Sequence, residues 1–356
     1  MLKKFLYLLV CVVFFMSACS SNQTSNAAPT SFPPTAPSTV SPVTPTPSVP
    51  LEYINPQKYQ VEYQVIIKNG AFNPSDIRLY LPVPSEYVEQ TDLKITKLEP
   101  EPISNIIEEK SGNRMAYWQW KDTPEKGDSI SVTMVFEFSA FETKTYLEHS
   151  FIKKAYNQVS RDYKEFISPE KYIESDNPKI IALADQLAGA ETNPVRIARS
   201  FYDHIIQTTK YKVLNQGLNG ALYLLENNTG ECGDYSSLFI ALCRAKGIPA
   251  RSVVGYWALS GIEQTHVWAE FFVEGIGWIP VDATIGQSRI ASRNFYFGNM
   301  DNSRVILSKG FNTQLVPSAP DNFIAGLLQG PFWWYWGSGD NKSLQMERYW
   351  TVKKIN

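Results

Sequence analysis

Three residue types in a fixed order could together carry out covalent chemistry in this chain. Cys232 follows Gly230 and Glu231, His266 follows Thr265, and Asp282 follows Pro280-Val281. A thiol can act as a nucleophile, an imidazole can take its proton, and a carboxylate can orient the imidazole. The order Cys232, His266, Asp282 therefore predicts acyl transfer through a thioester.

The position of Cys232 at the start of an expected helix favours its reactive form. Unpaired N–H groups and the helix dipole stabilise a thiolate at a helix N-terminus. The backbone N–H of Cys232 is a candidate donor to an oxyanion, and the small neighbour Gly233 would let a substrate carbonyl approach. Asp234 fits the first turn of the helix, where we expect it to act as a cap.

The strands that carry His266 and Asp282 must pair in one particular register. A four-residue loop over Glu274–Gly277 would place Asp282 opposite Ala269, on the wrong face of the hairpin. A five-residue loop or a bulge would place Asp282 opposite Trp268. It would then be diagonal to His266 on the same face and within side-chain reach. The mechanism thus predicts that the two residue numbers of each cross-strand pair in this hairpin add up to an even number.

A structural role is the alternative for each of these residues alone. A cysteine at a helix start is most often a small core residue, and a histidine on a strand is usually just packed. The joint occurrence of three compatible residues favours function, since the chain has only three histidines. Cys243 lies about 16 Å from Cys232 along the same helix, too far for a disulfide, and is expected in the core.

Alternating apolar residues predict a small β-sandwich in the N-terminal part of the chain. The clearest strands lie within residues 52–145, at Tyr59–Lys68, around Ile77–Leu81 and at Ile130–Phe138. Short strands of period two, separated by turn signals such as Asn69-Gly70 and without intervening helices, are typical of such a sandwich.

Helices followed by antiparallel strands predict an α+β domain in the second part of the chain. Helices are expected after Asn177-Pro178 and Asn193-Pro194, where asparagine is an N-cap and proline the first helical residue. A third helix is expected over Cys232–Lys246, ending at Gly247. Strands are expected at Ala250–Ala258, Thr265–Val273 and Trp278–Ala283.

The N-terminus predicts export and a lipid anchor. Two lysines precede the apolar run Phe5–Phe15, which has the length of a signal-peptide core and is too short to span a bilayer. The run ends in Ser17-Ala18-Cys19, which resembles the lipobox of bacterial lipoproteins, and by that resemblance Cys19 carries the lipid. The alternatives are an ordinary secretory signal or a short membrane anchor. The sequence does not distinguish between anchoring in the inner and in the outer membrane.

The expected organisation has five parts. Residues 1–19 form the signal peptide and 20–50 a tether rich in Pro, Ser and Thr. Residues 51–150 form the β-rich domain, 151–300 the catalytic domain and 301–356 a C-terminal extension. In this extension the aromatic run Pro331–Trp336 either packs against the body or forms a platform for substrate. The net charge of −2 argues against nucleic acid as a partner.

The segments that carry the three residues resemble the transglutaminase-like superfamily of papain-type thiol enzymes. The resemblance covers roughly residues 165–300 and rests on Gly230–Arg251, Thr265–Glu270 and Gly277–Thr284. It implies a papain-like α+β core in which a helix carrying the cysteine packs on an antiparallel sheet. It also implies Cys232 as nucleophile, His266 as base and acid, and Asp282 as the orienting carboxylate.

This resemblance leaves several points open. Animal transglutaminases use a tryptophan upstream of the cysteine for the oxyanion, but no tryptophan lies between Trp120 and Trp257. Gln216 and Asn219 are the alternative donors. The superfamily contains hydrolases and cross-linking enzymes, so an amidase, a peptidase and a transglutaminase acting on peptides or proteins all remain, as does a non-catalytic binding module. No acidic loop indicates calcium, and no metal or cofactor is expected.

Overall fold

The computed structural model describes residues 49–147, 155–214, 217–259, 264–317 and 319–356. Cys19, the expected signal peptide, most of the expected tether and Gln216 lie outside the described residues. Within the described ranges, no helix is long and apolar enough to cross a membrane.

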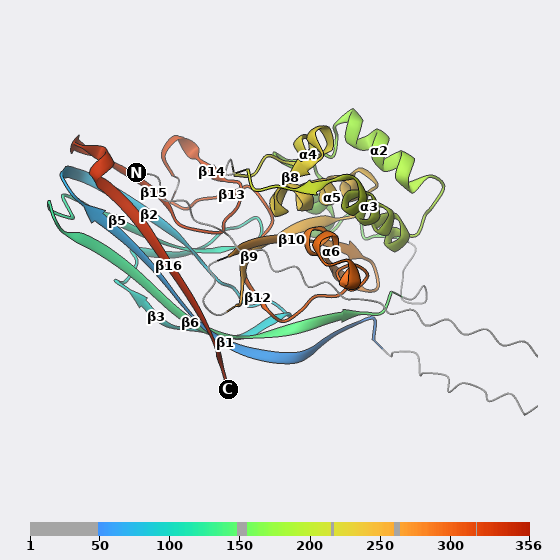
Figure 1. The fold of residues 1–356 in the computed structure, drawn as a ribbon, viewed down its shortest axis with the longest axis horizontal. Coiled ribbons are helices and arrows are strands. Elements are labelled where there is room, and N and C mark those ends of the chain that lie inside the picture. The colour runs from blue at the N-terminus through green and yellow to red at the C-terminus, as the bar shows by residue number, and fades with distance from the viewer. Residues whose placement is uncertain (1–48, 148–154, 215–216, 260–263, 318) are drawn as a thin grey trace, which may run out of the picture. The chain divides into compact units, whose positions relative to one another are not determined.

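Two antiparallel sheets of four strands each form a sandwich around a shared apolar core (Figure 1). One sheet has the order β16-β1-β6-β3 and the other the order β15-β2-β5-β4. The strands are β1 (Leu51–Asn69), β2 (Phe72–Val83), β3 (Gln90–Glu99), β4 (Ser104–Ile107), β5 (Arg114–Trp120), β6 (Ser129–Thr145), β15 (Phe332–Gly339) and β16 (Leu344–Ile355). The alternate residues Tyr59, Val61 and Tyr63 of β1 are buried, as the period of two predicts. The predicted sandwich is confirmed.

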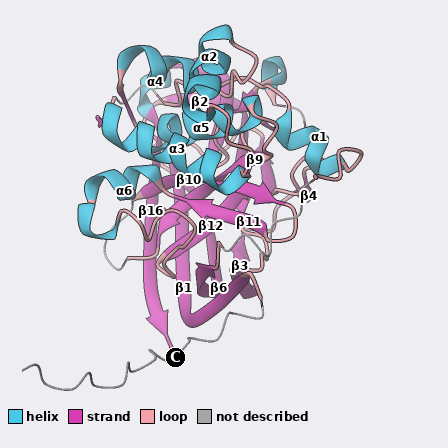
Figure 2. Ribbon diagram, turned by 90° about the vertical axis from the view of Figure 1, so that its right-hand side faces the viewer, coloured by secondary structure: helices cyan, strands magenta, loops and turns pink. Residues whose placement is uncertain are grey.

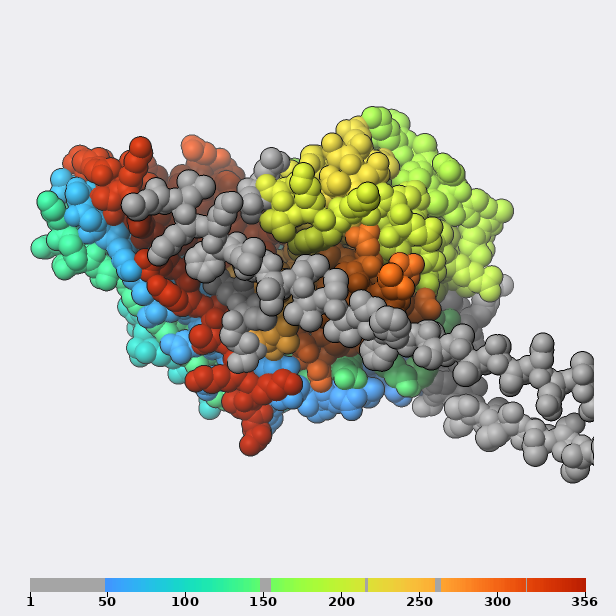
Figure 3. Space-filling model, in the orientation of Figure 1, coloured from blue at the N-terminus to red at the C-terminus, as the bar shows by residue number. Residues whose placement is uncertain are grey.

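The last part of the chain completes sheets that begin far upstream. Strand β16 pairs with β1 from Lys58↔Ile355 to Asn69↔Leu344, and β15 pairs with β2. In Figure 3 the C-terminal residues, in red, lie beside the first strands, in blue. The segment 301–356, expected as an extension, is therefore built into the folded body. The described residues belong to one compact unit.

A further antiparallel sheet, separate from the two sheets of the sandwich, carries the candidate site. Helices cover one of its faces. The sheet order is β11-β10-β9-β12. Figures 1 and 2 show this sheet between the helices and strands β1 and β6. Its strands are β9 (Ala250–Trp257), β10 (Thr265–Val273), β11 (Gly277–Val281) and β12 (Arg304–Lys309). The helices are α1 (Arg161–Ile167), α2 (Pro178–Ala188), α3 (Pro194–Thr208), α4 (Ala221–Asn227), α5 (Cys232–Ala245) and α6 (Ala283–Ser288). The remaining short strands are β7 (Lys210–Tyr211), β8 (Thr229–Gly230), β13 (Thr313–Gln314) and β14 (Ile324–Ala325). The α+β class is confirmed.

The helix boundaries follow from local sequence chemistry. The Oδ1 of Asn177 accepts a hydrogen bond from Lys179 N at 2.9 Å, and the Oδ1 of Asn193 accepts one from Val195 N at 2.9 Å. Each bond satisfies an N–H that has no partner within the helix. Gly247 follows α5 with φ of 68°, a backbone conformation that glycine adopts without steric cost.

Helix α5 is the central helix of the α+β part of the chain. Residues Gly233–Arg244 are all buried, so the helix is enclosed on every side. It contacts α2, α3 and α4 on one side and β9 and β10 on the other. Each fully buried large side chain, such as Phe239, contributes about 1.5–3 kcal/mol relative to exposure. This burial fixes the start of α5, and with it Cys232, against the sheet.

Candidate active site

Cys232 is the first residue of α5 and is half-buried. The first backbone bond of the helix runs from Tyr235 N to the carbonyl of Glu231 at 3.0 Å. The N–H of Cys232 therefore has no acceptor within the helix. The thiol lies where an anion is favoured and where a free backbone donor is close to the sulfur.

Asp234 joins this helix start to the loop that approaches it. Its Oδ2 accepts from Glu231 N at 3.0 Å, so it caps the helix as predicted. Its Oδ1 accepts from the N–H groups of Asn219 at 2.8 Å and Gly220 at 3.0 Å. Because Asp234 is buried, these bonds are protected from water and hold the loop beside Cys232.

Gly233 packs closely against the side chain of Leu218. A Cβ at this position would lie 2.8 Å from Cδ1 of Leu218, which is too close, and 3.9 Å from Cδ1 of Leu327. The sequence suggested that Gly233 leaves room for a substrate carbonyl. In the structure the space beside it is taken by the side chain of Leu218.

The hairpin of β10 and β11 adopts the register that the mechanism requires. The pairs run from Ala269↔Val281 to Val273↔Gly277, so the two residue numbers of each pair add up to an even number, as predicted. Asp282 follows β11 directly. It was expected inside a strand extending to Ala283, but β11 ends at Val281 and Asp282 is the N-cap of α6. Its Oδ1 accepts from Ile285 N at 3.0 Å, so the start of a short helix fixes the carboxylate.

His266 and Asp282 are in direct contact. Nε2 of His266 lies 2.7 Å from Oδ2 of Asp282, and both side chains are almost completely buried. The side chain of Cys232 lies close enough to the same imidazole to contribute to the rise of its pKa. Since Nε2 faces Asp282, Nδ1 is the ring nitrogen left for the thiol. This tautomer is the one in which a carboxylate orients a base toward a nucleophile.

Burial and neighbouring charges have opposite effects on the pKa values of Asp282 and His266. Burial alone would raise the pKa of Asp282, but the His266 ring and the Arg304 guanidinium hold it well below its usual range. Burial alone would lower the pKa of His266. The carboxylate of Asp282 and the contact with Cys232 outweigh that effect and raise the pKa of His266 to about 9. The site thus favours an imidazolium beside an ionised carboxylate.

Three residues around His266 were not identified from the sequence. The Trp257 ring stacks on the imidazole with centroids 4.9 Å apart at 28°. Arg304 Nη1 donates to Asp282 Oδ2 at 2.8 Å. Gln329 Nε2 donates to the backbone carbonyl oxygens of Gly255 at 2.8 Å and His266 at 3.0 Å. Arg304 and Gln329 lie in residues 301–356, which were expected as a C-terminal extension, so only the long-range fold reveals them.

The two residues considered for the oxyanion differ in their outcome. Gln216 lies outside the described residues. The side-chain amide of Asn219 donates to Gly217 O at 3.2 Å and to Asp234 Oδ2 at 3.4 Å, so it is engaged within its loop. Tyr211 is a further neighbour, since β7 pairs it with Gly230 just before Cys232. Burial and the Cys232 sulfur raise the pKa of Tyr211 to about 12, which keeps its hydroxyl a donor.

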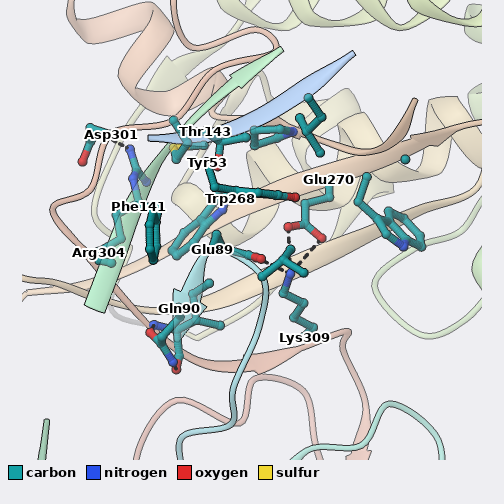
Figure 4. A pocket seen from close by; sticks show the side chains of 18 of the residues that line it. Tyr53, Glu89, Gln90, Phe141, Thr143, Trp268, Glu270, Asp301, Arg304 and Lys309 are labelled. Carbon is teal, nitrogen blue, oxygen red and sulfur yellow. Dashed lines mark hydrogen bonds and ion pairs between the residues drawn. The ribbon is translucent and has the colours of Figure 1, made fainter. Parts of the chain in front are cut away.

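A cavity of about 260 Å³ lies on the face of β10 that also carries His266 (Figure 4). Its wall includes Trp268 and Glu270 of β10 and Arg304 of β12, but neither Cys232 nor His266. Glu270 is paired with Lys309 at 2.9 Å and with Arg251 at 3.0 Å. These cations outweigh burial and lower the pKa of Glu270. The charges in this wall neutralise one another, and Arg304 links the cavity to the candidate site.

The remaining residues singled out in the sequence have structural surroundings. Cys243 is fully buried and its thiol pKa is raised well above the usual value by burial, in agreement with a core residue. The aromatic run forms part of β15, where Trp334 packs edge-on against Tyr80 at 5.7 Å between ring centroids. Trp336, which lies beside Arg78, is 41% exposed. The run is therefore mainly packed against the sandwich.

Comparisons with known proteins agree with this geometry. Residues 181–283 match the Transglutaminase-like superfamily. An uncharacterized protein of Haemophilus influenzae is 27% identical over 263 residues, which cover 65% of this chain and 69% of that protein. A protein-glutamine gamma-glutamyltransferase of Pseudomonas aeruginosa is 30% identical over 122 residues, which cover 30% of this chain and only 18% of that enzyme.

The fold also recurs in a solved structure. A candidate cysteine protease from Cytophaga hutchinsonii matches with a TM-score of 0.57 and 19% identity. The match covers 86% of this chain and 93% of that chain. At this identity the likeness concerns the fold alone. Residues 181–283 are thus similar to the transglutaminase-like superfamily, and the fold of the chain resembles that of a solved structure.

Proposed function

We propose that this chain is a thiol enzyme that acts on amide bonds of peptide or protein substrates through a thioester on Cys232. The observation that supports this most directly is the contact chain from Cys232 to His266 to Asp282, with 2.7 Å between Nε2 and Oδ2. The raised pKa of His266 makes its imidazole a base that can accept the thiol proton near neutral pH. These are the features of an activated cysteine nucleophile.

The reaction would proceed in two steps. His266 takes the proton of Cys232, and the sulfur attacks the carbonyl carbon of the amide. The oxyanion accepts hydrogen bonds from the N–H of Cys232 and, in this proposal, from the Tyr211 hydroxyl. His266 then donates its proton to the leaving amine, which leaves a thioester on Cys232. Water or a second amine attacks the thioester after losing a proton to His266, and the thiol is restored.

The acceptor decides between an amidase or peptidase and a transglutaminase. The Pseudomonas aeruginosa relative is named for γ-glutamyl transfer from protein glutamine, which supports glutamine side chains as acyl donors to test first. The candidate protease of the same fold supports backbone amides as a second class. A screen with glutamine peptides and cell-wall peptides, with and without a primary amine, separates these fates by the mass of the product.

The competing function is a binding module that keeps the fold without turnover. Alkylation with iodoacetamide, followed by mass spectrometry of the modified peptides, separates the two. If the protein is an enzyme, Cys232 is alkylated much faster than Cys243 near neutral pH. His266→Ala then removes this difference in rate. Cys243 serves as the internal control because it is fully buried. Equal and slow alkylation of both thiols would contradict the enzyme.

We further propose that the chain is exported and attached to a membrane of the bacterial envelope by a lipid on Cys19. The support is the sequence alone: a charged start, a short apolar run and small residues before the cysteine. Several acyl chains hold a protein stably on a bilayer, whereas one does so only marginally. Wild type should sediment with membranes and incorporate labelled fatty acid, while Cys19→Ser should not. Unlabelled wild type in the soluble fraction would overturn the anchor and leave the thiol chemistry untouched.

A further inference from the structure

The carboxylate oxygen that faces His266 has a second partner on its other side. Oδ2 of Asp282 lies 2.7 Å from His266 Nε2 and 2.8 Å from Arg304 Nη1. Arg304 Nη2 also donates to Asp301 Oδ2 at 3.1 Å. We propose that Arg304 is a positioning residue of this site, and that together with Asp301 it sets the pH range in which Cys232 reacts. This inference rests on the proposed role of Cys232.

The packing around Arg304 holds it in a single arrangement. Its side chain is only 4% exposed, and the carbon at the centre of its guanidinium lies 4.4 Å from the ring centroid of Trp257 and 4.9 Å from that of Trp268. Trp257 also stacks on His266. The same indole therefore packs against both partners of Asp282. A cation over aromatic rings is stabilised where water is excluded.

The charge of Arg304 acts on the equilibrium between thiol and thiolate. A positive charge near Asp282 offsets part of its negative field at His266 and favours an anion on Cys232. Removing that charge makes proton loss harder and moves the onset of reactivity to higher pH. Removing the negative charge of Asp301 acts in the opposite direction. The titratable or charged groups that face this cluster are Cys232, His266, Asp282, Asp301, Arg304, Tyr202, Arg289 and Tyr296.

An arginine suits this place for a geometric reason. One planar guanidinium reaches two carboxylates at once, one through each terminal nitrogen, whereas a lysine offers a single point charge. Asp301 is 23% exposed in its side chain and borders the cavity beside Trp268 (Figure 4). Asp301→Asn therefore changes a charge at the edge of the cluster without opening the core.

The test measures the rate of Cys232 alkylation by iodoacetamide as a function of pH, with the full chain and with no substrate. For Arg304→Gln we expect the midpoint of the profile to rise by about one pH unit. For Asp301→Asn we expect a fall of about half a unit, because that charge is partly screened by water. Arg304→Lys keeps the charge but cannot hold both carboxylates at once, so the midpoint should rise by less than in Arg304→Gln.

The opposite signs distinguish a role in the site from general damage. Loosened packing would change the rate in the same direction in all variants. Asp76→Asn is the matched control, since Asp76 is also paired with an arginine, Arg78, but lies in the sandwich. It should leave the midpoint unchanged. If Arg304→Gln does not fold, the sign for Asp301→Asn decides alone, and a rise or no change there overturns the inference.

The proposed function and this inference fail in different ways. If Cys232 of the wild type reacts only as an ordinary thiol, with the midpoint of its pH profile at about 8.5, it is not an activated nucleophile. The proposed function and this inference would then both be wrong. A wild type that reacts well below that pH, combined with variants that do not shift in opposite directions, would overturn the role of Arg304 and Asp301 alone.

Discussion

Gln329 and His266 are joined by a hydrogen bond of 3.0 Å from the side-chain Nε2 to the backbone carbonyl oxygen. The same nitrogen donates to Gly255, which is the partner of His266 across the β9–β10 pair. A side chain from the segment after β14 thus satisfies two carbonyls at the end of the strand that carries the imidazole.

Gln329→Leu should weaken this end of the sheet. It leaves two carbonyl oxygens without their donor, and we expect a loss of about 1–3 kcal/mol in the free energy of unfolding. Because the strand end carries His266, the alkylation rate of Cys232 should fall as well. Urea unfolding and alkylation kinetics measure the two effects. Gln345→Leu is the control, since Gln345 is exposed and should change neither.

Asp282→Asn should keep the fold and impair the chemistry. Asparagine can still accept from Ile285 N and cap α6, but it neither stabilises the His266 cation nor favours the required tautomer. We expect alkylation of Cys232 at pH 6 to fall about tenfold or more, since at least one pKa unit of stabilisation is lost. A variant that melts like wild type and alkylates at the full rate would exclude Asp282 from the mechanism.

The stability of the protein should depend on pH through the same pair. The pKa of His266 is raised to about 9 in the folded state, against about 6.5 in the unfolded chain. Its contribution is therefore fully present below about pH 6.5 and is lost as the pH rises through about 9, a loss on the order of 3 kcal/mol. The pKa of Asp282 is lowered, so its contribution is present above the unfolded value of about 3.9 and lost on further acidification.

The measurement is urea unfolding of wild type and His266→Gln at pH 6 and pH 9. The difference between the two proteins isolates His266 from other groups that titrate in this range. We expect wild type to lose more stability than the variant on going to pH 9. An equal loss in both proteins would show that the imidazole has no raised pKa in the folded state.

Gly255→Ala should disturb the pairing of β9 and β12. A Cβ at Gly255 would lie 1.8 Å from the carbonyl oxygen of Val305, and a backbone atom cannot move aside without displacing its strand. The next residue upstream of Val305 is Arg304, so the contact with Asp282 should be lost with it. We expect a lower melting temperature and slower alkylation of Cys232, measured by calorimetry and by mass spectrometry.

Ser252→Ala on the same strand is the control for this variant. The Ser252 hydroxyl is buried and has no hydrogen-bond partner among the described residues. Its removal should be neutral or slightly stabilising, because no bond is broken and a polar group leaves the core. If both variants destabilise equally, the strand is merely sensitive to substitution and the close approach at Gly255 is not the cause.

Local patterns were sufficient to predict the elements that carry Cys232 and His266. The caps at Asn177 and Asn193, the strand over Thr265–Val273 and the helix from Cys232 all depend on neighbouring residues, and the sequence shows them. The register of the β10–β11 hairpin could also be predicted, because only one of the two possible registers places His266 and Asp282 on the same face. The end of β11 did not follow, since the strand pattern continues to Ala283 while Asp282 caps a six-residue helix.

The partners that come from the C-terminal segment could not be predicted. Arg304 reaches Asp282 only because β12 pairs with β9, and Gln329 reaches His266 only because the chain returns beside Gly255. Such contacts depend on long-range pairing, for which a single sequence without clear periodicity carries no local signal. The sequence therefore indicates the three residues proposed as nucleophile, base and carboxylate, while the groups that orient them emerge from the tertiary fold.

The pairing of the last strand with the first has a consequence for how the protein is made. Strand β1 is synthesised before the other described strands, and β16 after them. Until β16 arrives, one edge of β1 presents unpaired N–H and C=O groups over twelve residue pairs. The sandwich can close only after β16 has been synthesised, so a chain truncated before Leu344 would retain an open edge prone to association with other chains.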